Sequence, residues 1–113
     1  MKNQIVDLIT GVKNGSIDFK GVIAFIEQHY THTPTAFKNG EVYNDASQNQ
    51  GSAKVFSFAG LNSLSEDDTL SLFAEHYGAV LDNPTATDHQ NIRQFMAHGW
   101  QGIVFEGEAL AAK

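Results

Sequence analysis

Three neighbouring residues in the last third of the chain are the first candidates for chemistry. Asp88, His89 and Arg93 lie close together, and the spacing of four between His89 and Arg93 puts both on one face of a helix. Next to a serine, such an imidazole can act as a general base, and the guanidinium can hold an anion. In the alternative interpretation, Asp88 and His89 begin the helix and Arg93 pairs with a surface carboxylate. No GxSxG motif accompanies them, so we expect no catalytic residue.

A polar run from Asn44 to Ser52 is the second candidate, because almost all its residues are small, polar or amide-bearing. If Gly51 and Ser52 open a helix, their main-chain N–H groups point at an anion, with Lys54 adding positive charge. Simple capping of that helix by Ser52 is the alternative. The run lacks the spaced glycines and the Lys-Ser/Thr order of a P-loop.

The histidines do not have the spacing of a metal site. His29 and His32 are three residues apart, but His32 falls where its helix should already end. His89 and His98 are nine apart and face opposite sides of a helix. The chain has no cysteine and no HExxH motif. We therefore expect no metal and no cofactor.

Trp100, within the stretch HGWQG, is the remaining side chain of interest. An indole at a helix end can seal the edge of a core while its N–H reaches a carbonyl. It can equally be an exposed anchor for a partner protein.

Helical spacing of apolar residues predicts about five helices that position these side chains. Asp18 resembles an N-cap for the second helix, and Ser65 with Asp68 resembles a capping box that starts the fourth. Thr87 with Gln90 suggests a capping box for the last helix. The apolar stripes are Ile5, Leu8, Ile9 and Val12; Val22, Phe25, Ile26 and Tyr30; Val55, Phe58 and Ala59; Leu70, Phe73, Ala74 and Tyr77; and Ile92, Phe95 and Met96.

The third of these stripes is ambiguous, because Phe56 and Phe58 also alternate as in a strand. We assign it to a helix that begins near Ser52. Asn39-Gly40 predicts a type I′ hairpin near residues 35–43, and a strand near residues 102–106 would complete a small antiparallel sheet. The predicted fold is a helix-rich α+β domain, single over residues 1–113.

Composition limits the possible partners. A hydrophobic fraction of 42% describes a soluble globular protein. A formal net charge of −6 argues against nucleic acid as a partner. No apolar run approaches the roughly 20 residues of a membrane span, so we expect no membrane insertion. We expect a monomer in the bacterial cytoplasm.

The order of several motifs resembles the HopJ family of type III effector-like proteins, also called HopPmaJ. The resemblance covers nearly the whole chain and rests on TPTAF, NG, QN, GS and Lys54, followed by HxxIRxF and GWxGI. It implies an effector-like bacterial protein, delivered to a host cell if it is a true effector, without an established biochemical activity.

The resemblance also marks which polar residues to watch. The site it suggests, together with the residues above, is Asn44, Gln48, Asn49, Ser52, Lys54, His89, Arg93 and Trp100. The leading interpretation is a non-catalytic interaction module that recognises a protein partner of the host or the bacterium. A small enzyme or binding protein for an anionic small molecule is the first alternative, and a bacterial housekeeping domain that is never exported is the second. The anion hypothesis requires the polar residues to converge on one concavity.

Overall fold

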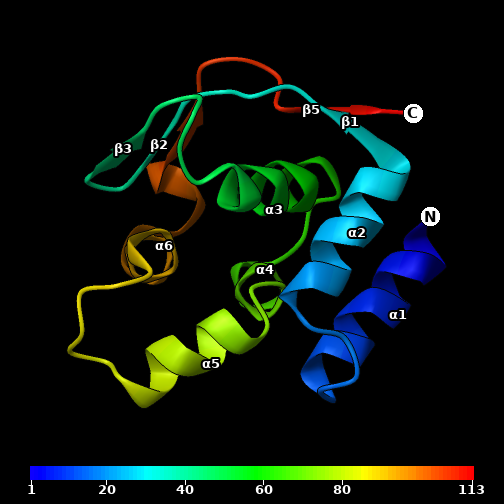
Figure 1. Cartoon of the computed structure of the whole chain (residues 1–113), viewed down its shortest axis with the longest axis horizontal. Helices are drawn as coiled ribbons and strands as arrows, with labels where there is room; N and C mark the ends of the chain where they lie inside the picture. Colours follow the sequence, from blue (N-terminus) through cyan, green and yellow to red (C-terminus); the bar gives the residue numbers. More distant parts are fainter.

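A computed structural model describes all residues, 1–113, as a helix-rich α+β domain, the predicted class. It has six α-helices, one more than expected, and a short 3₁₀ helix (Figure 1). The helices are α1 (Lys2–Lys13), α2 (Phe19–His29), α3 (Gln50–Leu61), α4 (Glu66–Ser71), α5 (Glu75–Asp82), α6 (Gln90–His98) and the 3₁₀ helix η1 (Gly99–Gly102). The strands are β1 (Tyr30–His32), β2 (Phe37–Asn39), β3 (Val42–Asn44), β4 (Ile103–Phe105) and β5 (Leu110–Ala112). None of the helices combines the length and apolar character needed to cross a membrane.

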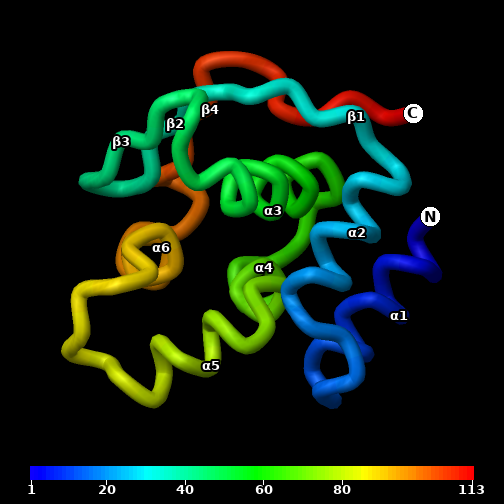
Figure 2. The backbone as a smooth tube through the Cα atoms, viewed as in Figure 1, coloured from blue at the N-terminus to red at the C-terminus, as the bar shows by residue number.

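The strands form one long antiparallel ribbon above the helices (Figure 2). The predicted hairpin and C-terminal strand are confirmed as a sheet of order β3-β2-β4, and a second sheet pairs β1 with β5. One register runs through both sheets, from Tyr30 opposite Ala112 to Phe37 opposite Phe105. Between the two sheets the N–H of Thr35 donates to the Gln50 side chain and not to the opposite strand, which accounts for the interruption.

The hairpin turn differs from the prediction by one residue. Asn39 pairs with Val42 across the strands, so the central turn residues are Gly40 and Glu41. Gly40 takes the positive φ of 58°, as in turns that need glycine at the first central position. Asn39 therefore belongs to β2, and its side chain is fully buried. This one-residue shift brings Asn39 into the polar interior described below.

Helix α3 is the centre of the domain, with α2 on one flank and the ribbon over it (Figure 1). Its buried residues Val55, Phe56 and Phe58 face different neighbours. The Phe56 ring lies 6.1 Å from Phe37 of β2 and 5.0 Å from Phe95 of α6, between ring centroids. The helical interpretation of this segment is confirmed, and burial on several sides explains why its apolar pattern is ambiguous.

The predicted N-caps have different outcomes. Asp18 and Ser65 each accept a hydrogen bond from a first-turn N–H, as expected. The prediction of a Thr87 cap is wrong: α6 begins after His89, and the Gln90 side chain donates to the Thr87 carbonyl instead. The predicted fourth helix divides into α4 and α5 at Ala74, whose φ of 53° and ψ of −124° interrupt the helix.

Replacing Ala74 by glycine should stabilise the protein. A Cβ atom is strained at this φ, so Ala74→Gly should raise the free energy of unfolding by about 1 kcal/mol. Urea denaturation gives the value. In the matched control, Ala79→Gly inside α5 should lower stability by about 1 kcal/mol. A loss of stability in both variants would contradict the strain assigned to Ala74.

Candidate functional site

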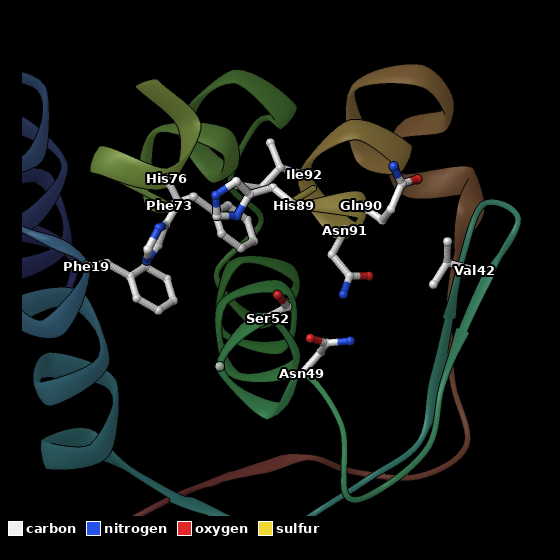
Figure 3. Close-up of a pocket in the computed structure, with 11 residues that line it drawn as sticks. Phe19, Val42, Asn49, Ser52, Phe73, His76, His89, Gln90, Asn91 and Ile92 are labelled. Atoms are coloured by element: carbon white, nitrogen blue, oxygen red, sulfur yellow. The ribbon is translucent and has the colours of Figure 1, made fainter. Parts of the chain in front are cut away.

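A groove of about 460 Å³ opens between the N-terminal ends of α3 and α6 (Figure 3). We call it the helix-terminus groove. Asn49 and Ser52 line it from the start of α3, and His89 lines it from the start of α6. Phe19 of α2 and His76 of α5 close the opposite side. Each of these elements reaches the groove with its first turn or its N-cap.

Neither helix that opens into the groove has a side-chain cap. The N-cap residues Asn49 and His89 have left-handed φ values of 52° and 51°, and neither side chain accepts a hydrogen bond from its helix. An ordinary N-cap is extended, and its side-chain oxygen accepts a first-turn N–H. The main-chain N–H groups of Gly51, Ser52 and Asn91 have no acceptor within the chain, although these residues line the groove. Two positive helix ends therefore face one concavity.

Asn49 does not cap α3 because a buried amide network engages its side chain. Its Nδ2 atom donates to Oδ1 of Asn44 at 2.7 Å. Asn44 is 1% exposed and exchanges hydrogen bonds with the side chain of Asn91, at 3.2 and 3.0 Å. Asn39 also donates to Asn91, at 3.0 Å to its Oδ1 atom. The network joins β2, β3 and both helix starts, and so fixes the two helix ends relative to each other.

Two histidines meet at the upper rim of the groove (Figure 3). The rings of His76 and His89 lie 5.2 Å apart between centroids. The Phe19 ring lies 4.9 Å from His76, in an edge-on arrangement. The Nε2 atom of His89 lies 3.9 Å from a carboxylate oxygen of Asp88. The imidazoles supply hydrogen-bond donors beside an aromatic surface.

Arg93 forms hydrogen bonds with the loop before α6 and does not line the groove. Its guanidinium donates to the main-chain carbonyls of Asn83 and Pro84 at 3.0 and 3.2 Å. It also donates to the Asp88 carboxylate at 2.8 Å, which lowers the pKa of Asp88 from its ordinary value. This is the pairing with a carboxylate that the sequence offers as the alternative to anion binding. The contact is present while Asp88 is ionised, and it weakens as the pH falls through that lowered pKa.

The remaining predicted residues lie at other places. Lys54 pairs with Glu27 of α2 at 2.9 Å. Gln48 is exposed and accepts the Asp45 N–H at 3.4 Å within the turn before α3. Trp100 is half-buried, with its ring edge-on to Phe95 at 5.0 Å. Of the eight predicted residues, Asn49, Ser52 and His89 line the groove and Asn44 supports it from behind, whereas Gln48, Lys54, Arg93 and Trp100 do not reach it.

Several residues that line the groove were not predicted as site residues, among them Asn91, Phe19 and His76. Asn91 had a usable signal, because it is a polar residue on the inward face of α6 beside Ile92 and Phe95. Phe19 and His76 had none, since they come from α2 and α5 and no spacing rule links them to α6. Gln50 was also missed, although its side chain holds both the N–H and the carbonyl of Thr35 and thereby attaches α3 to the ribbon.

The HopJ type III effector protein family matches residues 5–110 of the sequence. The chain belongs to this family. A crystal structure of VPA0580, described as a protein of unknown function, is similar to this HopJ-family chain at 46% sequence identity. The similarity has a TM-score of 0.90 and covers 98% of this chain and 92% of the other. None of the curated proteins matches the sequence.

Proposed function

We propose that this HopJ-family protein is a non-catalytic binding module that holds a small anionic molecule in the helix-terminus groove. The observation that carries the proposal is that two uncapped helix N-termini open into one concavity. Exposed N–H groups at the positive end of a helix dipole are a favourable place for an oxyanion. The amide network around Asn44 supports this role, because it fixes both helix ends before any ligand arrives.

The other walls of the groove indicate the kind of anion. Phe19, Phe73 and Ile92 add apolar surface next to the polar helix ends. The rings of His76 and His89 lie next to each other, and their N–H groups can donate hydrogen bonds to an oxyanion. A phosphate ester with a flat apolar group fits both sides of the groove: its phosphate can contact the polar helix ends, and its apolar group can contact the apolar wall. The volume of about 460 Å³ is typical of sites for such small molecules.

Phenyl phosphate tests the proposal, with inorganic phosphate and phenol as partial ligands. Titration followed by NMR of backbone amides should move the signals of Gly51, Ser52 and Asn91. Phenyl phosphate should bind more tightly than phosphate, and phenol should not bind. Unmoved amide signals with every ligand would overturn the proposal. Steady release of phenol would show catalysis and overturn the non-catalytic part.

A charge substitution at Ser52 separates binding from folding. Ser52 is the third residue of α3, where a carboxylate is favourable for the helix but occupies the anion position. Ser52→Glu should therefore keep the stability of the protein and weaken phenyl phosphate binding at least about tenfold. Gln4→Glu on the exposed face of α1 changes the net charge equally and should bind as the unaltered protein does. Equal weakening in both variants would assign the effect to net charge alone.

The proposed binding site does not depend on the compartment in which the protein acts. The family description points to delivery by a type III apparatus, whereas the housekeeping alternative keeps the protein in the bacterial cytoplasm. A translocation reporter fused to the full chain distinguishes the two. The groove can bind its ligand in the host cell or in the bacterial cytoplasm, because it recognises the ligand by charge and shape.

A further inference from the structure

The ribbon has an unpaired outer edge. Strand β4 pairs only with β2, and β5 pairs only with β1, so the β4–β5 side of the ribbon lacks a neighbouring strand. Exposed strand edges in natural proteins are usually protected by lysine, proline or a bulge. Strand β4 contains only Ile103, Val104 and Phe105, and Val104 is 58% exposed. Nothing in this strand opposes the addition of another.

The hydrogen-bond register defines which main-chain groups face outward. Gly40 donates to the Gly102 carbonyl, and Glu106 donates to the Ala36 carbonyl. In an antiparallel ladder, alternate residues point their N–H and C=O groups to the same side. Val104 therefore bonds toward β2, and Phe105 directs both its N–H and its carbonyl toward the open edge. A pair of main-chain groups is available there for a residue of another strand.

An apolar hollow of about 280 Å³ lies beneath this edge, between the ribbon and the end of α3. We call it the Trp100 hollow, because the indole forms one wall. Gly60 and Leu61 of α3 form another wall, and Leu61 is 58% exposed. Ile103 and Phe105 line the side next to the free edge. The free main-chain groups of Phe105 and an apolar recess thus adjoin each other.

We propose that β4 binds an extended peptide segment of a partner protein as an additional strand. A residue opposite Phe105 would exchange main-chain hydrogen bonds with it and point its side chain to the same face, into the Trp100 hollow. The charge near the edge defines the partner further: Glu106 and Glu108 are both exposed, and Glu108 is the charged residue of the hollow. The segment that fits is an alternating one, apolar toward the hollow and basic toward solvent.

This surface is separate from the helix-terminus groove and shares no lining residue with it. The anion experiment and the peptide experiment can therefore fail independently. The second surface also gives the half-buried Trp100 a role as a partner contact, beside its packing against Phe95.

Trp100 is the single tryptophan of the chain, so its fluorescence reports occupancy of the hollow. The test peptide is acetyl-KVTVKVT-amide, in which valine alternates with basic or hydroxyl residues. We expect a saturable change in emission on titration. The same peptide N-methylated at its central valine lacks one main-chain donor, and it should bind at least about tenfold more weakly. Absence of a saturable change, or equal binding of the two peptides, would overturn the proposal.

A variant at Gly60 blocks the hollow without removing a contact. A Cβ atom at Gly60 would lie 3.8 Å from the Trp100 ring, an ordinary contact, and the position is exposed. The Gly60→Leu protein should fold normally by circular dichroism and bind the peptide at least about tenfold more weakly. Gly78→Leu is the control: a Cβ atom at Gly78 has open space around it, so this variant should bind the peptide with unchanged affinity. Unchanged peptide affinity in a folded Gly60→Leu protein would overturn the proposal. So would a dimer in sedimentation that Gly60→Leu dissociates, because the edge would then serve a second copy of the chain.

Discussion

An Asn44→Ala variant should lose about 2–4 kcal/mol of its free energy of unfolding. The Asn44 side chain is buried and forms hydrogen bonds with Asn49 and Asn91 and with the Phe37 carbonyl. Its removal leaves Nδ2 of the buried Asn91 without an acceptor, and this group then carries its full desolvation penalty, whereas Oδ1 of Asn91 keeps its donor Asn39. The hydrogen bonds to Asn49 and to the Phe37 carbonyl are lost as well. Urea denaturation gives the loss, with an unchanged slope if the unfolded state is unaffected.

The same variant should also bind phenyl phosphate more weakly, because Asn49 and Asn91 lose the contact that fixes the two helix ends. Asn3→Ala on the exposed face of α1 is the matched control and should change stability by no more than about 0.5 kcal/mol. A loss below about 1 kcal/mol for Asn44→Ala would contradict the network, since it would mean that the freed groups find other partners.

Phe56→Ala should be at least as damaging, with a loss of about 3–5 kcal/mol. The side chain is 1% exposed, and its ring contacts Phe37, Phe73 and Phe95 from three different parts of the fold. No single element can move to fill the resulting cavity without breaking a contact elsewhere. Thermal or urea denaturation measures the effect, and Phe56→Leu provides a milder variant if the alanine protein does not fold.

Phe25→Ala on α2 is the comparison for this prediction. Its ring is half-buried and touches His29 and Phe58, so the expected loss is about 1–2 kcal/mol. An equal loss at the two positions would show that Phe56 does not have the central role assigned to it. The contrast therefore tests the position of α3 and not only the size of the side chain.

Local patterns predicted most of the architecture. The stripe from Ile5 to Val12, the Asp18 cap and the Ser65 cap identified helices α1, α2 and α4 because these signals act within one or two turns. The Asn39-Gly40 pair identified the hairpin, although the turn centres on Gly40 and Glu41. The pairing of β1 with β5 was missed, since it joins residues far apart in sequence and each strand has three residues. The break at Ala74 was missed because alanine is normally a strong helix former.

The residues of the candidate site were likewise predicted in part from local sequence patterns. The sequence indicated that Ser52 and His89 stand at helix starts, although the N-cap of α3 is Asn49 and not Ser52. It also determined the helix-rich α+β class, the hairpin and the family motifs. Only the tertiary structure brought the two helix starts to one groove, added Phe19 and His76 to it, and engaged Lys54 and Arg93 elsewhere. The physical reason is that capping and turn preferences act over a few residues, whereas convergence on one groove depends on how distant helices pack around Phe56.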